Sequence, residues 1–485
     1  MAEICLRLDR LPLALELVAA RVKVLTPDQI LTRLERRLDL LASGPRDLPE
    51  RQRTLRNTIA WSYGLLDETE RSLFARLAVF PGSFDLDAAE AIATAALDQL
   101  QSLVDKSLLR RTEAGRFFML ETIREYAVEQ LEGTGATDSI QRGHADYFLA
   151  LAERAAVELR GPNQTVWLGR LDAEHDNFRS ALTWLGGADE AEAELRLSIA
   201  LTRFWYVRGH ITEARSWLDK VLSANEVLAA TAGQPAPLRA QVVTSASAFA
   251  LIQGDYPEST RLAEESLQLA RGQDDPGRIA NALSNLGAVV LAGGDTARAR
   301  QLLEEAAALS RGLDEKPVAA RAFNNLGDLE LTVGGYAQAE TLFQESLVLL
   351  RELGDTSNVA RSLFNLGAAV LQLGRHGEAL SHFRESIALS RETEDKEDLA
   401  WCLEGFAALA AAEGNPERAA RLLGAADALL DAMGGEFKPF ERRLHEETVA
   451  AIRSRLAPHS FDAMRAEGKS LSLEQAAEYA LETAD

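Results

Sequence analysis

The sequence predicts a mostly α-helical protein, with a small winged-helix domain followed by an α-solenoid. The first observation behind this prediction is a set of glycines spaced 40 residues apart: Gly254, Gly294, Gly334, Gly374 and Gly414. The second is a short hairpin pattern that follows a run of helical segments, near residues 107–120. A fixed period of about 20 to 50 residues is typical of stacked repeats, each of which buries an apolar face against its neighbour.

Each repeat is expected to consist of two amphipathic helices. In the repeat that spans residues 321–353, apolar residues recur at helical spacing up to Gly334, and a second such run begins at Ala337. Gly327 and Ala339 are small residues at the point where the two helices should cross closely. A larger side chain at either position should therefore push the pair apart.

Three consecutive units share the same small, aliphatic and aromatic positions. These are Leu286, Gly287, Gly294, Ala299 and Leu303, then Leu326, Gly327, Gly334, Ala339 and Phe343, then Leu366, Gly367, Gly374, Ala379 and Phe383. The pattern resembles the tetratricopeptide repeat family, and it weakens in the units around Gly254 and Gly414. The family's usual period is about 34 residues, so the extra residues would add roughly 9 Å of helix to each unit.

One polar position also recurs with the repeat. Asn285, Asn325 and Asn365 each precede a Leu-Gly pair, and we expect them on the concave face that the first helices line. Further polar residues expected on this face are Asn324, Arg321, Arg361 and Asp328, which would make the face mixed in charge. An asparagine both donates and accepts hydrogen bonds, which suits the backbone of an extended peptide. Two interpretations remain open: a groove for a protein or peptide partner or a small-molecule inducer, or asparagines that hold neighbouring helices in register.

Residues 51–135 predict the winged helix. The expected helices span 51–65, 67–79, 85–95 and 97–106, and the expected strands span 107–112 and 116–120. The candidate recognition helix, 97–106, carries Asp98 and Asp105 against the single cation of Lys106. This composition is poor for a phosphate-lined groove, so direct DNA binding is disfavoured and is kept as an alternative.

A second resemblance covers about the first 185 residues. It is carried by the segments 11–16, 55–63, 74–80, 103–108, 120–127 and 174–177. Their order is similar to that of STAND-type (NB-ARC-like) regulatory ATPases, which join a nucleotide-binding core to a winged helix and tetratricopeptide repeats. The resemblance implies a helical remnant at 1–50, with Pro12 matching a proline that packs near the adenine. Arg10 replaces the family's glycine, and Leu120 stands where eukaryotic members carry a phosphate-sensing histidine.

A nucleotide-binding core is not expected in this sequence. The nearest string to GxxxxGK[ST] runs from Ala463 to Ser470, but it follows a helical pattern and is interpreted as a helix end capped by Gly468. We therefore expect no catalytic residue, no enzymatic activity and no cofactor. Pro12 would contact a nucleotide only if a separately encoded NTPase core were supplied in trans, which makes half of a split ATPase another alternative.

The remaining features favour a cytoplasmic signal-transduction protein. The net charge of −22 disfavours nonspecific binding to nucleic acid or membrane, and two cysteines offer no disulfide framework. No uncharged apolar stretch is long enough for a membrane span, and the seven histidines show no His-x₃-His spacing, so we expect no metal site. The remaining expected segments are a helical linker with degenerate repeats at 140–230, the solenoid at 238–434 and capping helices at 435–485.

Overall fold

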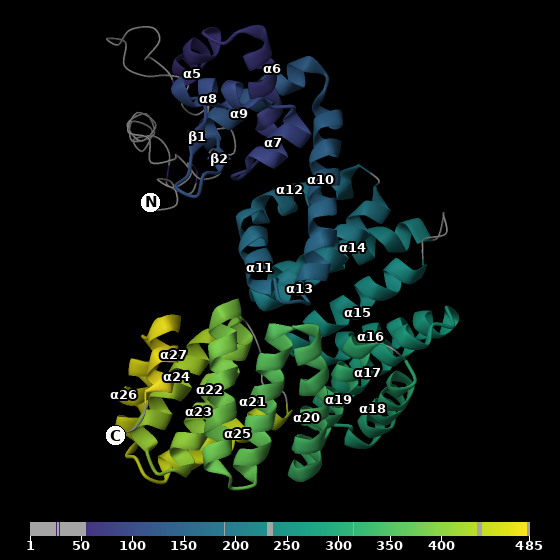
Figure 1. Ribbon diagram of the computed structural model, residues 1–485, viewed down its shortest axis with the longest axis vertical. Coiled ribbons are helices and arrows are strands. Elements are labelled where there is room, and N and C mark those ends of the chain that lie inside the picture. The colour runs from purple at the N-terminus through teal and green to yellow at the C-terminus, as the bar shows by residue number, and fades with distance from the viewer. Residues whose placement is uncertain are drawn as a thin grey trace. The chain divides into compact units, whose positions relative to one another are not determined.

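The structure is a computed structural model that describes residues 55–188, 190–229, 236–313, 315–433 and 439–482, together with Thr26 and Gln29. The expected remnant at 1–50, including Pro12, otherwise lies outside the described residues. The chain forms two compact units. The first comprises Met1–Leu151 and Arg170–Glu190, and the second comprises Ala152–Gly169 and Ala191–Asp485 (Figure 1).

The first unit contains the winged helix that the sequence predicts. The elements of the first unit are α5 (Leu55–Gly64), α6 (Glu68–Arg76), η4 (Leu77–Val79), α7 (Leu86–Ala93), α8 (Leu97–Asp105), β1 (Arg110–Arg111), β2 (Phe117–Phe118), α9 (Glu121–Thr134) and α12 (His175–Gly187). Helix α6 begins with a capping box, because Asp67 accepts a hydrogen bond from the backbone N–H of Glu70 while the Glu70 carboxylate accepts one from that of Asp67.

The wing is shorter than the sequence predicts. Arg110 pairs with Phe118 and Arg111 with Phe117 in an antiparallel ladder. The expected strand from 107 is cut short because the backbone N–H groups of Leu108 and Leu109 both bond to the carbonyl of Leu103 in α8. Leu108 and Leu109 therefore bond to the C-terminal end of α8 and do not pair with the second strand.

The second unit is a series of helical hairpins. It includes the end of α10 (Thr137–Glu158) and the start of α11 (Gln164–Ala173), followed by α13 (Ala191–Val207), α14 (Ile211–Ala229), α15 (Ala236–Ile252), α16 (Tyr256–Gly272), α17 (Pro276–Ala292), α18 (Thr296–Arg311), α19 (Lys316–Val333), α20 (Tyr336–Leu353), α21 (Thr356–Gln372), α22 (His376–Thr393), α23 (Lys396–Ala412) and α24 (Pro416–Met433). Each hairpin from α15/α16 onward packs against the next, which confirms the solenoid (Figure 1).

The glycines of the 40-residue period end the first helix of each hairpin. All five have positive φ, from 73° at Gly254 to 91° at Gly294, a conformation that favours glycine. Inside the hairpins, a second glycine permits a close crossing. A Cβ on Gly327 would lie 2.6 Å from Phe343, and one on Gly367 would lie 2.6 Å from Phe383. The expected need for a small residue at Gly327 follows directly from this contact.

The weaker repeat around Gly254 has serines at the positions where its two helices cross. Ser247 and Ser259 stand 40 residues before Gly287 and Ala299, and both are fully buried. Each hydroxyl donates to the backbone carbonyl of the other residue at 2.8 Å. The polar side chains thus satisfy one another where the later repeats use glycine and alanine.

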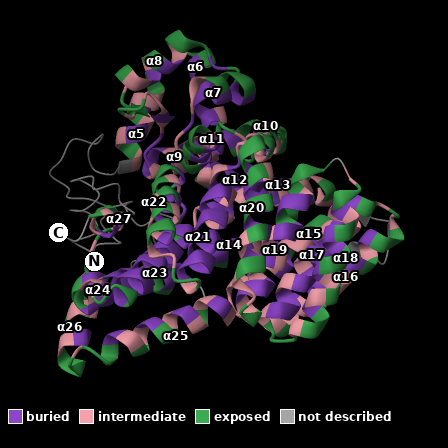
Figure 2. Cartoon of the chain, turned by 60° about the horizontal axis from the view of Figure 1, so that its bottom comes forward, coloured by how far each residue is buried: buried purple, intermediate pink, exposed green. Residues whose placement is uncertain are grey.

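Three further helices cover the last hairpin: α25 (Pro439–Arg453), α26 (Pro458–Lys469) and α27 (Leu473–Leu481). Helices α25 and α27 pack on α23, which together with α21, α22 and α24 leaves α23 buried along most of its length, as its colouring in Figure 2 shows. Gly468 lies inside α26 against the backbone of Arg421 in α24, so its small size permits a close helix crossing, whereas the C-cap of α26 is Ser470. This differs from the expected helix cap. Along the described residues, no helix combines the length and apolarity that a bilayer span requires.

Candidate partner-binding face of the solenoid

The six predicted groove residues lie on consecutive first helices of the repeats. Asn285 belongs to α17, the residues Arg321, Asn324 and Asn325 to α19, and the residues Arg361 and Asn365 to α21. Helix α19 contacts both α17 and α21 directly. We call the surface of α17, α19 and α21 that carries these side chains the first-helix face.

The asparagines form a ladder of hydrogen bonds between repeats. The side-chain amide of Asn285 donates to the hydroxyl of Ser247 at 3.2 Å, and that of Asn325 donates to the carbonyl of Ser284 at 3.1 Å. The amide of Asn365 donates to the carboxylate of Asp328 at 2.9 Å. Each bond crosses to the preceding first helix, as one of the two interpretations of the sequence requires.

Asn324 belongs to the same ladder but acts as an acceptor. Its side-chain carbonyl accepts a hydrogen bond from the hydroxyl of Ser362 at 3.1 Å. The ladder is more open on α17 and α19, where Asn285 and Asn325 are half-buried, whereas Asn365 on α21 is buried. A partner could therefore reach the first two asparagines more easily than the third.

Arg321 is exposed on this face and lies in a positively charged environment. Its guanidinium donates to the side-chain carbonyl of Asn281 at 2.8 Å. Surrounding protein and the charges of Arg160 and Arg203 lower the pKa of Arg321 to about 10. The carboxylate of Asp355 pairs with Arg203 at 2.7 Å. The negative charge of Asp355 opposes the effect of these two arginines on the pKa of Arg321.

Arg361 occupies the same repeat position as Arg321 but lies in an enclosed acidic environment. Its guanidinium pairs with Asp398 at 2.6 Å and with Glu397 at 3.2 Å. It also stacks over the ring of Tyr206 at 5.1 Å. Burial lowers the pKa of Arg361, but the negative charges of Asp398 and Glu397 outweigh it and raise that pKa well above its ordinary value.

Reasoning from the sequence did not find the residues that α13 contributes to this surface. Arg203 and Tyr206 reach the repeats from more than 100 positions earlier in the chain, through Asp355 and Arg361. Arg208 extends the same contact by donating to the backbone carbonyl of Thr393 at 2.9 Å. The aromatic run of residues 204–206 was the only signal, and it was interpreted as part of a degenerate repeat.

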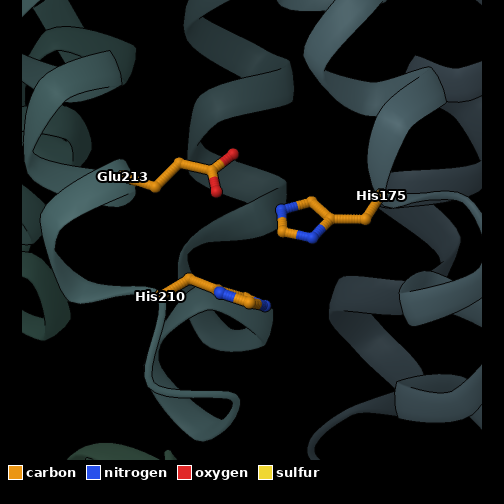
Figure 3. A group of neighbouring side chains, drawn as sticks. All are labelled: His175, His210 and Glu213. Carbon is orange, nitrogen blue, oxygen red and sulfur yellow. The ribbon is translucent and has the colours of Figure 1, made fainter. Parts of the chain in front are cut away.

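The start of α14 carries polar groups near a shallow hollow. His210 precedes this helix and Glu213 lies in its first turn, while His175 is the first residue of α12 in the first unit (Figure 3). The ring of His210 packs 5.6 Å from that of Phe204. The hollow is lined by Thr212, Arg215, Ser216, Asp219, Lys220, Ser223 and Gln253, and it is too open to define a ligand site.

Two family models match the chain. A tetratricopeptide repeat model matches residues 240–312 and 318–392, and a winged helix-turn-helix model matches residues 66–132. The chain therefore combines a winged helix with a tetratricopeptide repeat solenoid.

Relatives in Mycobacterium tuberculosis share part of the sequence. One, named as a candidate HTH-type transcriptional regulator, is 36% identical over 299 residues, which are 59% of this chain and 34% of the relative. Another, named an uncharacterized protein, is 38% identical over 181 residues, which are 35% of this chain and 43% of the relative. The chain thus spans about a third of the length of the first of these relatives.

Two solved structures align with much of the chain. A STAND protein with a tetratricopeptide repeat sensor from Pyrococcus horikoshii aligns with a TM-score of 0.40 at 14% identity, covering 93% of this chain and 73% of that one. A Rap protein complexed with Competence and Sporulation Factor aligns with a TM-score of 0.43 at 13% identity, covering 68% of this chain and 95% of that one. These likenesses are too distant to carry an argument about function.

Proposed function

We propose that this chain is the sensing part of a transcriptional regulator and that its first-helix face receives an extended, acidic segment of a protein or peptide partner. The observation that carries the proposal is the exposed Arg321, whose pKa is lowered by the nearby charges of Arg160 and Arg203, while Asp355 pairs with Arg203. The name of the mycobacterial relative supports a role in transcription.

Charge and geometry both favour an anionic group beside Arg321. A guanidinium presents a planar fork that binds a carboxylate with two parallel hydrogen bonds. Within a partly enclosed surface such a bond is stronger than in bulk water, because protein replaces part of the solvent. Burial, and after it the positive charge of Arg203, also lower the pKa of Arg160, as expected where like charges lie close to one another. An acidic partner would relieve that repulsion.

The asparagine ladder would then hold the backbone of the partner. Asn285 and Asn325 use their amide hydrogens between repeats, and their side-chain carbonyls would accept N–H groups from an extended segment. Asn365 and Arg361 are more enclosed, and in this proposal they support the face instead of contacting the partner. The solenoid would thus bind through α17 and α19.

The test is a fluorescence-polarisation titration with labelled extended hexapeptides, each made in an aspartate form and a matched asparagine form. We expect the aspartate forms to bind more tightly and Arg321→Glu to weaken them by roughly 10- to 100-fold, since a charged hydrogen bond contributes about 1.5–3 kcal/mol. Arg351→Ala is the control, because Arg351 is an exposed arginine on the second helix α20. Equal binding of both peptide forms, or equal loss with the control variant, would overturn the proposal.

DNA binding by the winged helix is the second candidate function. Arg110 and Arg111 are exposed on β1, which favours it. Lys106 beside α8 is instead bound to Glu70 at 2.7 Å, and Arg116 pairs with Glu174 at 2.6 Å, so two other cations of this domain are already neutralised. A mobility-shift titration at low salt decides between the candidates. A retained complex that Arg110→Ala and Arg111→Ala together abolish would support DNA binding.

A further inference from the structure

We propose that Glu404, Asp427 and His445 form a binding site for a divalent transition-metal cation of the Zn²⁺ type. The three residues come from three different helices of the second unit: α23, α24 and α25. They meet where the last hairpin of the solenoid is covered by the first of the C-terminal helices. This site is separate from the first-helix face and does not depend on the proposed function.

The distances between the donor atoms suit a single ion after small side-chain rotations. The Nδ1 atom of His445 lies 2.9 Å from Oε1 of Glu404. One ligand atom from each of the three residues lies within 4.8 Å of the others. Around a tetrahedral Zn²⁺ with bonds of about 2.0–2.2 Å, donor atoms are roughly 3.4 Å apart.

Burial provides an independent indication of a missing partner. The side chain of Glu404 is 2% exposed, and its Oε2 atom is buried without a hydrogen-bond partner among the described residues. A buried carboxylate oxygen without a partner is costly, and native structures rarely leave one. A cation bound between Glu404 and its neighbours would satisfy this oxygen.

The donor set indicates which cations would bind. One imidazole nitrogen and two carboxylates suit Zn²⁺, Co²⁺ or Mn²⁺, whereas Mg²⁺ and Ca²⁺ prefer oxygen ligands alone. The Nε atom of Arg465 lies 2.5 Å from Oδ2 of Asp427, so this arginine would orient the carboxylate from outside while Oδ1 faces the ion.

Metal binding at this point would fasten the terminal cover of the solenoid. A terminal repeat needs its apolar edge covered, and α25 contributes to that cover by packing on α23 and α24. The same helix reaches back to α19, because Arg443 donates to the carbonyls of Leu331 and Thr332 at 2.7 and 2.9 Å. An ion that joins α25 to α23 and α24 would therefore also stabilise the contact of α25 with α19.

The experiment is an isothermal titration of the chelator-treated, dialysed full chain with ZnCl₂, followed by CoCl₂ with absorption spectroscopy. We expect one equivalent of Zn²⁺ to bind and the Co²⁺ form to show the intense visible bands of a four-coordinate site. Glu404→Gln and His445→Gln should each weaken Zn²⁺ binding by more than the roughly 10- to 100-fold that loss of a supporting residue costs. His382→Gln on α22 is the matched control, since this histidine lies outside the cluster.

The outcomes separate a metal site from a hydrogen-bonded pair. If Glu404 and His445 only stabilise each other, the wild-type chain will bind no stoichiometric Zn²⁺, and this result would overturn the proposal. Equal Zn²⁺ affinity in the wild type and both variants would overturn it too. Far-ultraviolet circular dichroism checks that the variants are folded. If one is not, Asp427→Asn replaces it, with the same weakening expected.

Discussion

Arg321 and Arg361 occupy the same position in successive repeats, yet their surroundings are opposite. Arg321 is exposed, lies near two other arginines, and makes a hydrogen bond to Asn281. Arg361 is 19% exposed and is enclosed by Asp398, Glu397 and the ring of Tyr206. The difference arises because Asp398 and Glu397, at the start of α23, pair with Arg361 and α13 places the ring of Tyr206 against it. The arginine of one repeat is thus exposed, whereas the arginine of the next repeat is enclosed.

The largest expected effect is the loss of the enclosed arginine. Arg361→Ala leaves Asp398, 2% exposed, without the guanidinium that pairs with it, so we expect a loss of about 3–5 kcal/mol in the free energy of unfolding. Arg321→Ala should change it by no more than about 0.5 kcal/mol, because the side chain is exposed. Urea unfolding measures both variants. Similar losses of unfolding free energy in the two variants would contradict the difference in environment between Arg321 and Arg361.

The glycines at the helix crossing should behave alike in the two repeats. A Cβ at Gly327 or Gly367 would overlap Phe343 or Phe383, so we expect each Gly→Ala change to destabilise the fold by about 1–3 kcal/mol. Gly377→Ala in α22 is the control, since its added Cβ meets no atom within 4 Å. Thermal unfolding tests the series. A large loss of stability for only one of the two Gly→Ala variants would contradict this prediction and show that the helix crossings of the two repeats differ in packing.

The asparagine ladder should show a smaller difference. Asn365→Ala removes a buried amide that donates a hydrogen bond to Asp328, for which we expect a loss of about 1–2 kcal/mol in the free energy of unfolding. Asn325→Ala removes bonds to Ser284 at a half-buried position, and about 0.5–1.5 kcal/mol is expected. Chemical unfolding and peptide titration together decide its role. If Asn325→Ala loses stability but still binds the peptide, Asn325 only holds neighbouring repeats together and does not contact the partner.

The acidic cluster around Arg361 should make the covered repeat sensitive to pH. Burial and the charges of Asp398 and Glu397 raise the pKa of Asp395 well above its ordinary value, although Arg361 opposes this shift. Between the ordinary and the raised pKa, the folded chain keeps a proton that the unfolded chain has lost. The free energy of unfolding therefore falls as pH rises through that window, by at most about 1.4 kcal/mol per pH unit for one proton.

Asp395→Asn tests this dependence without removing the helix cap, since asparagine also caps helices well. We expect the free energy of unfolding of the variant to fall less than that of the wild type as pH rises above the ordinary aspartate pKa of about 4. Asp275→Asn, at the exposed start of α17, is the matched control and should leave the pH dependence unchanged. A control that flattens the curve equally would refute the assignment to the buried cluster.

Local residue patterns were enough to predict most of the fold. The turn glycines, the small residues at the crossings and the hairpin around Gly115 each act on neighbours within one hairpin, so their spacing reveals them. The length of the wing could not be predicted, because Leu108 and Leu109 bond back to Leu103 and leave only two residues in each strand. The proposed metal cluster was also missed, because its residues are up to 41 positions apart and share no motif.

The sequence by itself determined the period of the solenoid, the helix pairs and the first-helix face, because these follow from contacts repeated every 40 residues. Only the tertiary structure decided which positions of that face stay open. Arg321 and Arg361 are equivalent in the repeat pattern, and a helix distant in the chain distinguishes them, because α13 brings Tyr206 over Arg361. Such contacts depend on the way the unit folds back on itself, and no local pattern records that.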